Sequence, residues 1–226
     1  MISLQGIEKK FGRKKVIDDL SLDIHPGEFI SLFGPNGAGK TTFLRILSGQ
    51  LGLDSGRIDG ESRIAQQSRT GFISHQVMLY PDLTGLENLE LFARLHNQIS
   101  PGDAAGRMIR LVNLERDASR HVRDYSRGML QRLSLGRALI NDPELLLLDE
   151  PFTGLDRQGV DFLTEILNQG RSQGKTVIMA THNLRTGYDL ADRLLVMERG
   201  RISLDALTRE MDFGTFTSRY EEVAGK

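Results

Sequence analysis

The chain has 226 residues, of which 39% are hydrophobic, and 29 basic against 30 acidic residues give a net charge of −1. This length suffices for one sizeable core, and the near-zero charge gives no global basic field, so we expect no nucleic-acid partner. The sequence contains no cysteine, which excludes a disulfide framework and thiolate metal sites and fits a reducing cytoplasm. No apolar run is long enough for a bilayer, so we expect membrane association only through a partner.

The first 30 residues read as short strands joined by polar turns, which predicts a small antiparallel flap. Later in the chain, the continuous apolar runs Leu145–Leu148 and Val177–Ala180 are typical of parallel strands buried on both faces, with helices as crossovers. The expected fold class is therefore α/β with a mostly parallel sheet. Strands are expected near residues 2–7, 20–24, 28–33, 57–58, 71–74, 145–148, 176–180 and 193–197.

A phosphate-binding loop is the strongest chemical signal. Residues 34–41 read Gly-Pro-Asn-Gly-Ala-Gly-Lys-Thr, which fits G-x-x-x-x-G-K-[ST], and they follow the strand-like run 28–33. The glycines let backbone N–H groups turn toward a polyphosphate, and the helix that starts near Thr41 points its positive end at the same anion. Lys40 adds a charge for the β and γ oxygens, and the Thr41 hydroxyl is placed to ligate Mg²⁺. The strand before and the helix after disfavour a chance match, so the loop predicts nucleoside triphosphate binding.

Apolar residues recur at helical spacing in the middle of the chain. Leu86, Leu89 and Phe92 lie near one helix face, and Met108 and Leu111 continue a second pattern. We therefore expect a helical subdomain inserted in the α/β core. The single domain 1–226 is expected to divide into a β-flap at about 1–30, a core at about 28–82 and 142–205, the helical subdomain at about 83–141, and a C-terminal extension at about 206–226.

Two carboxylates end the most apolar strand. Leu145–Leu148 is followed by Asp149 and Glu150, and the backbone bends at a strand end so that both side chains can reach a ligand above the sheet edge. Asp149 is then the residue on the Mg²⁺ side, and Glu150 is the candidate general base for the attacking water. The alternative is a strand end with two solvated acids. The phosphate loop upstream and Thr181-His182 after a later strand favour the catalytic interpretation.

These features occur in a single order along the chain: the phosphate loop, Gln76, residues 125–132, the strand ending in Asp149-Glu150, residues 154–156 and His182. In this order and spacing, residues 1 to about 205 resemble the nucleotide-binding domain of an ABC transporter. Within that family, the chain is most similar to ATP-binding subunits of the haem-exporter type used in cytochrome c maturation. The resemblance implies a P-loop NTPase of ABC type, with a RecA-like core, an N-terminal antiparallel β-subdomain and an inserted helical subdomain.

The resemblance also implies a Mg²⁺-dependent ATPase that powers transport through separate transmembrane subunits on the cytoplasmic face of the membrane. Lys40, Glu150 and His182 would be catalytic, with His182 hydrogen-bonded to the γ-phosphate. Gln76 would be catalytic too and would touch Mg²⁺, beside the metal ligands Thr41 and Asp149. Phe11 would stack on adenine with Val16 alongside, although an ordinary core aromatic is the alternative. The implied ATP-binding residues are Phe11, Val16, Gly34, Pro35, Asn36, Gly37, Ala38, Gly39, Lys40, Thr41 and Thr42.

The signature segment departs from the family's commonest Leu-Ser-Gly-Gly-Gln. Tyr125 replaces Leu, Arg127 the first Gly and Met129 the Gln, while Ser126 and Gly128 remain. The resemblance implies that Ser126, Arg127, Gly128 and Met129 meet the γ-phosphate of a nucleotide on the opposite subunit, since ATP lies at the interface of a head-to-tail pair. Asp156 would belong to the interface loop.

Apolar residues crowd just after Gln76, where a polar loop would be expected. Val77, Met78, Leu79, Tyr80 and Leu83 suggest a docking groove for a helix of another chain. The alternative is that they seat the helical subdomain. A second functional class also stays open, namely an ABC ATPase without a pore, such as an assembly scaffold or a translation factor. A purely structural ATP-binding module is disfavoured, because Glu150 and His182 are both present.

Overall fold

A six-stranded sheet forms the centre of the molecule. The computed structural model describes residues 1–60, 70–74 and 78–225. The strands of this sheet are β3 Phe29–Phe33, β5 Thr70–Ile73, β6 Leu145–Asp149, β7 Thr176–Ala180, β8 Arg193–Glu198 and β9 Arg201–Leu207. Their order is β5-β6-β7-β3-β8-β9, with all neighbours parallel except β8 and β9. Strands β3, β6 and β7 are buried along their whole length, as their apolar runs predicted.

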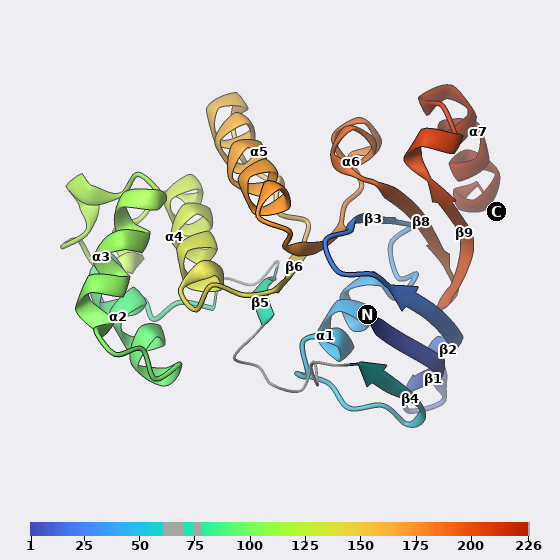
Figure 1. Ribbon diagram of the computed structural model, residues 1–226, viewed down its shortest axis with the longest axis horizontal. Coiled ribbons are helices and arrows are strands. Elements are labelled where there is room, and N and C mark those ends of the chain that lie inside the picture. Colours follow the sequence, from blue (N-terminus) through green and yellow to red (C-terminus); the bar gives the residue numbers. More distant parts are fainter. Residues whose placement is uncertain (61–69, 75–77, 226) are drawn as a thin grey trace.

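A separate antiparallel sheet packs beside this one. Its strands are β1 Ile2–Phe11, β2 Lys14–Ile24 and β4 Ser55–Gly60, in the order β2-β1-β4. Helix α1, Lys40–Leu47, lies between the two sheets, because its buried face shares one core with residues of both (Figure 1). The flap thus extends beyond the first 30 residues, since β4 returns after α1 to complete it.

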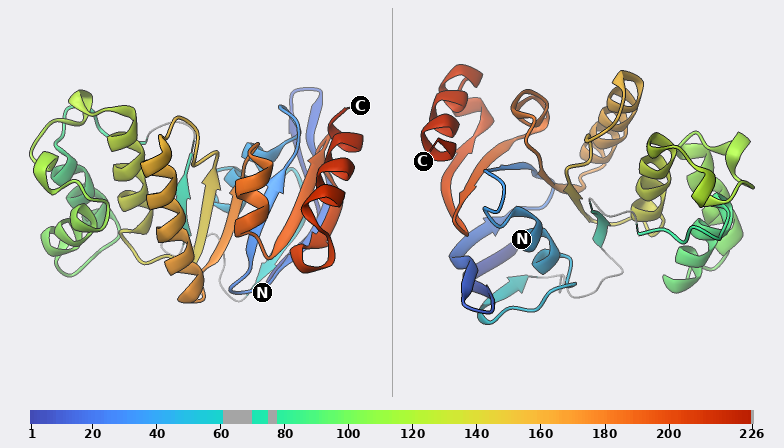
Figure 2. Two further views of the ribbon diagram at one scale, coloured as in Figure 1. Left: turned by 90° about the horizontal axis from the view of Figure 1, so that it is seen from above. Right: turned by 180° about the vertical axis from the view of Figure 1, so that it is seen from behind.

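Helices also cover the face of the central sheet that lies opposite α1. They are α5 Arg157–Ser172, α6 Leu184–Leu190 and α7 Phe213–Ala224. Figure 2 shows from above that these three helices stand side by side along the sheet, and their apolar residues share a second core with β3, β6, β7 and β8. Among the described residues, no helix has both the length and the apolar character needed to cross a membrane.

The helical subdomain stands beyond β5, at one end of the molecule (Figure 1). It contains α2 Gly85–Leu95, α3 Pro101–Leu111 and α4 Arg127–Leu139, with short 3-10 turns at Glu115–Asp117 and Val122–Asp124. Thr84 starts α2 with a reciprocal capping box, in which its hydroxyl accepts from the Glu87 N–H while the Glu87 carboxylate accepts from the Thr84 N–H.

The C-terminal part contains two elements that the sequence analysis did not predict. Strand β9 pairs antiparallel with β8 through the two-residue turn Arg199-Gly200, in which both φ angles are positive, 48° and 83°. After the 3-10 turn Thr208–Glu210, α7 returns across the sheet. Its Phe216 is fully buried, with its ring centroid 4.9 Å from that of Phe33. The last helix of the chain therefore packs on the residue that precedes the phosphate loop.

Candidate nucleotide site

The phosphate loop joins β3 to α1 in a backbone conformation that needs glycine. Gly34 and Gly39 have φ of 146° and 113°, and a Cβ at these positions would lie 2.2 Å from the Met197 carbonyl oxygen and 2.7 Å from that of Val16. No side chain caps the start of α1 at Gly39. The first amides of this helix are therefore available for an anion.

The Lys40 ammonium lies across the loop. It donates to the Gly34 carbonyl at 2.6 Å and to the Pro35 carbonyl at 3.2 Å. Burial lowers the pKa of Lys40, while the charges of Glu150 and Asp149 oppose this shift. The loop thus holds a partly desolvated cation next to two carboxylates, which is a suitable environment for a polyphosphate with a divalent cation.

Thr41 and Asp149 form a hydroxyl–carboxylate pair from two distant elements. The Thr41 hydroxyl, at the start of α1, donates to Asp149 Oδ2 at 2.8 Å, and Asp149 at the end of β6 is only 4% exposed. Mg²⁺ is commonly held in proteins by one or two carboxylates together with substrate phosphates. No cluster of three His, Asp or Glu residues that could hold a metal is present within the described ranges. The hydroxyl of Thr41 and the carboxylate of Asp149 fit a Mg²⁺ ion that arrives with a nucleotide.

Glu150 faces His182 across neighbouring strand ends. Its backbone is left-handed, with φ of 54°, and its N–H donates to the Ala180 carbonyl at 2.9 Å. One carboxylate oxygen lies 2.7 Å from His182 Nδ1 and accepts from the His182 N–H at 3.3 Å. The His182 side chain is 69% exposed. The strained backbone directs Glu150 toward the imidazole, and such strain is concentrated at functional sites.

A pocket of about 350 Å³ unites most of the predicted nucleotide residues. Phe11 and Val16 of the flap line it together with the phosphate loop, as the interpretation of an adenine platform requires. The sequence analysis missed Lys14, two positions before Val16 on β2, where strand alternation places both side chains on one face. The lining residues are Phe11, Lys14, Val16, Asn36, Gly37, Ala38, Gly39, Lys40, Thr41, Thr42, Asp149 and Glu150.

Gly34, Pro35 and His182 adjoin this pocket without lining it: the first two residues start the loop, and His182 contacts Glu150. Gln76, predicted as a catalytic residue and a Mg²⁺ ligand, lies outside the described residues. Tyr220 of α7 was not foreseen. Burial raises the pKa of its phenol, and the negative charge of Glu150 adds to this shift.

The signature segment lies elsewhere in the chain. None of Ser126, Arg127, Gly128 and Met129 lines the pocket. Ser126 caps α4, because its hydroxyl accepts from the Met129 N–H at 3.3 Å. Tyr125 is buried, and its hydroxyl donates to the Asp117 carbonyl at 2.7 Å.

The Arg127 guanidinium lies on the loop that contains Asp156. A Cβ at Gly154, whose φ is 79°, would lie 2.3 Å from Arg127 Nε. Asp156 in turn caps α5, accepting from the Gly159 N–H at 2.8 Å. Signature and interface loop therefore contact each other within one chain, and neither lines the pocket of its own phosphate loop.

This arrangement defines a class: a P-loop nucleoside triphosphatase with a carboxylate–histidine pair beside the phosphate loop. The family model described as ABC transporter matches residues 17–153. The chain belongs to this family. It therefore binds and hydrolyses ATP with Mg²⁺, and the predicted ABC-type α/β fold is confirmed.

Similar proteins agree with this assignment. The uncharacterized ABC transporter ATP-binding protein YdbJ of Bacillus subtilis (strain 168) is 37% identical over 220 residues, which cover 94% of this chain and 71% of that protein. Nod factor export ATP-binding protein I of Paraburkholderia xenovorans (strain LB400) is 40% identical over 209 residues, covering 88% and 68%. The dimeric, post-hydrolysis structure of the ATP-binding cassette MJ0796 with ADP and Pi superposes with a TM-score of 0.84 at 26% identity, covering 92% and 99%.

Proposed function

We propose that this chain is the ATP-hydrolysing subunit of an exporter-type ABC transporter, peripheral on the cytoplasmic face of the membrane and joined to separate transmembrane subunits. The observation that carries the proposal is the convergence of Thr41–Asp149 and Glu150–His182 on one phosphate loop. A protein named for Nod factor export is among the relatives, which favours export as the direction. An ABC ATPase without a pore is the alternative that the experiment below tests.

The positions of the site residues indicate their roles in ATP hydrolysis. Lys40 and the loop amides neutralise charge that develops on the transferred phosphoryl group, and Thr41 and Asp149 would hold Mg²⁺. Bound Mg²⁺ would supply further neutralisation of the phosphate oxygens. Glu150 accepts the proton of the attacking water. His182 Nδ1 orients that carboxylate at 2.7 Å, and its exposed ring can approach the γ-phosphate.

ATP is proposed to lie between two copies of the chain. One chain supplies the phosphate loop, and its signature residues, Ser126 with the start of α4, do not line that loop's pocket. MJ0796 is described as a dimer both with ADP and Pi and in a second structure. A head-to-tail pair would bring each Ser126 to the partner's nucleotide, so that both sites are completed together.

The haem-exporter subtype receives no support from these relatives, whose names refer to an uncharacterized transporter and to Nod factor export. The family is therefore the level at which the sequence resemblance holds. The exported compound is set by the transmembrane subunits, and permease genes beside the gene for this chain would identify its class.

The predicted docking segment is only partly exposed. Met78 and Tyr80 are exposed, Tyr80 to 51%, whereas Leu79 packs on the core of the helical subdomain. The buried Asn88 amide fixes the loop, since it donates to the Tyr80 carbonyl at 3.0 Å and accepts from the Tyr80 N–H at 2.8 Å. Leu83 is half-buried, and Val77 lies outside the described residues. Among the described residues of the segment, Met78 and Tyr80 are therefore the apolar side chains that support a role in docking.

Co-expression with the neighbouring permease genes tests this function. Tyr80→Asp should release the chain from the membrane fraction and leave ATP binding by the purified subunit intact, because Tyr80 does not line the nucleotide pocket. Ile99→Asp is the matched control, as Ile99 is a fully exposed apolar residue of the same subdomain. Wild-type protein that never sediments with membranes would favour the ATPase without a pore.

A further inference from the structure

Helix α4 holds the loop of residues 150–156, which begins at the predicted base, at two points. The Gln131 side-chain amide donates to the Pro151 carbonyl at 2.8 Å. The Arg127 guanidinium occupies the place where a side chain at position 154 would project, since a Cβ on Gly154 would lie 2.3 Å from its Nε and 2.8 Å from its Nη1. Arg127 and Gln131 are four positions apart on α4, so both side chains lie on one face of the helix. One helix face therefore contacts both the start and the middle of the loop.

This loop is tightly turned, so its position sets the direction of Glu150. The Thr153 N–H donates to the Glu150 carbonyl at 3.2 Å, and the Leu155 N–H donates to the Phe152 carbonyl at 3.2 Å. Glu150 itself has a left-handed backbone, with φ of 54°, and such a conformation persists only where the surrounding structure holds it. A shift of the loop near Gly154 would therefore change where the Glu150 carboxylate points.

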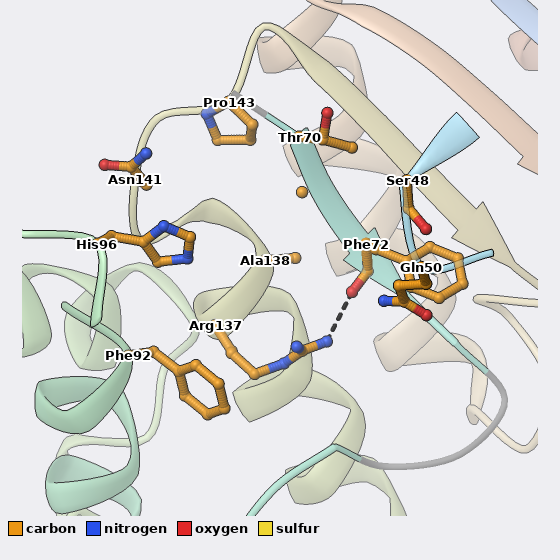
Figure 3. Close-up of a pocket in the computed structure, with 11 residues that line it drawn as sticks. Ser48, Gln50, Thr70, Phe72, Phe92, His96, Arg137, Ala138, Asn141 and Pro143 are labelled. Carbon is orange, nitrogen blue, oxygen red and sulfur yellow. Dashed lines mark hydrogen bonds between the residues drawn. The ribbon is translucent and has the colours of Figure 1, made fainter. Parts of the chain in front are cut away.

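Helix α4 is a fixed support for these contacts, because it is also anchored along its length. Near its end, the Arg137 guanidinium donates to the Phe72 carbonyl of β5 at 2.6 Å and lies over the Phe92 ring of α2 (Figure 3). Nearer the loop, the Arg132 guanidinium lies over the Phe162 ring of α5, 5.0 Å from its centroid. A helix held against β5, α2 and α5 can hold the loop in one place.

We propose that Arg127 is a positioning residue for ATP hydrolysis: by resting on Gly154 it fixes the loop and so directs Glu150 of its own chain. The inference rests on the proposed function and deepens it, because it assigns the Arg127 side chain to the site of the same chain and not to the partner's nucleotide. The family's commonest signature has glycine in place of Arg127, and glycine has no side chain for this contact. Arg127 therefore adds a connection between the signature of this chain and its own catalytic base.

Turnover by the purified chain is the first test. Arg127→Ala should lower kcat by about tenfold, because a small displacement of a reacting group has a large effect, and should leave KM for ATP within about twofold. Gly154→Ala should also lower kcat, since its Cβ would meet the guanidinium. The double variant should be no slower than Gly154→Ala, because both changes break one contact. Arg116→Ala, at an exposed arginine of the same subdomain, is the control and should have no effect. Losses that multiply, or a wild-type kcat for Arg127→Ala, would overturn the proposal.

Mixed pairs show on which chain Arg127 acts. A wild-type chain and a Glu150→Gln chain with different tags, captured together with ATP, form a pair in which the wild-type chain alone has the base. Arg127→Ala should slow a single turnover when it is in the chain with the intact Glu150, and should have no effect in the Glu150→Gln chain. The reverse result would assign Arg127 to the partner's nucleotide and overturn the proposal. If no mixed pair can be captured, the proposed head-to-tail pairing is contradicted, whereas the kcat comparison still decides the role of Arg127.

Discussion

The phosphate-loop region and the signature region differ in how completely one chain builds them. Around the phosphate loop, a hydrogen bond joins Thr41 to Asp149 across 108 positions of sequence, and Glu150 meets His182 across 32. At the signature, the Ser126 hydroxyl is engaged locally, as the cap of α4 at 3.3 Å, and Ser126 and Arg127 are exposed. The first region brings its groups together within one chain, whereas the second presents its groups outward. A single chain therefore contains two unlike halves of a site.

The largest expected effect is on ATP hydrolysis by the phosphate-loop region. Glu150→Gln should slow ATP hydrolysis by about a hundredfold or more, since a positioned base is lost, and should leave ATP binding in place. Steady-state phosphate release and ATP-binding titrations check both statements. Lys40→Ala is the comparison variant, which should lose binding as well as hydrolysis. Wild-type turnover by Glu150→Gln would mean that the base is another group.

The signature region is tested by measuring whether the chain dimerises with ATP. Glu150→Gln protein should dimerise when ATP is added. The double variant Glu150→Gln, Ser126→Arg should not dimerise, because bulk and charge replace a small hydroxyl at the start of α4. Light scattering across micromolar concentrations measures the mass. Ser172→Arg, at the exposed end of α5, should have no effect. An ATP-bound interface that tolerates Ser126→Arg would place the signature away from the partner's nucleotide.

The contact of Arg127 with Gly154 can be measured as a coupling between the effects of two substitutions on the free energy of unfolding. Gly154→Ala should destabilise the protein by about 1–2 kcal/mol for the left-handed backbone alone, and more because its Cβ would meet the guanidinium. Arg127→Ala should remove only the second part, so the double variant is more stable than the sum of the single effects predicts. Chemical denaturation gives the values. Strict additivity would show that Arg127 does not lie on this loop in solution.

The smallest effect is expected at Lys14. Removing this exposed cation should weaken ATP binding by about two- to fivefold, and the loss should shrink as salt is added. Lys10→Ala is the control, since Lys10 lies on the flap but does not line the pocket. Equal affinities of the two variants would mean that Lys14 plays no part in nucleotide binding.

Local patterns predicted the parts of this site that are local in sequence. The phosphate loop and Asp149-Glu150 each follow an apolar strand, so their positions at the sheet edge could be inferred from the order of residues alone. Lys14 could have been found in the same way, because strand alternation pairs it with Val16. Strand β9 also left a signal, since Ile202 and Leu204 alternate with polar residues after Arg199-Gly200.

Other features depend on contacts between distant segments and leave no local pattern. The flap needs β4, which begins 31 residues after β2 ends, and no feature of residues 55–60 specifies β1 as the partner. The contact of Arg127 with Gly154 joins segments that lie 27 positions apart and follows from how α4 packs beside the loop before α5. Arg137 looks in the sequence like one more basic residue of a surface helix, and only the structure shows that its side chain is buried, which lowers its pKa to about 10.

The place of β3 in the sheet has a consequence for how the chain is made. Phe29–Phe33 lies between β7 and β8, and both of these strands are synthesised more than 140 residues later. On the ribosome, the phosphate loop therefore emerges long before the strand that carries it has either neighbour. Until then β3 has two open edges of apolar sequence, which are the features that promote pairing between nascent chains. Truncation before residue 176 would make that exposure permanent.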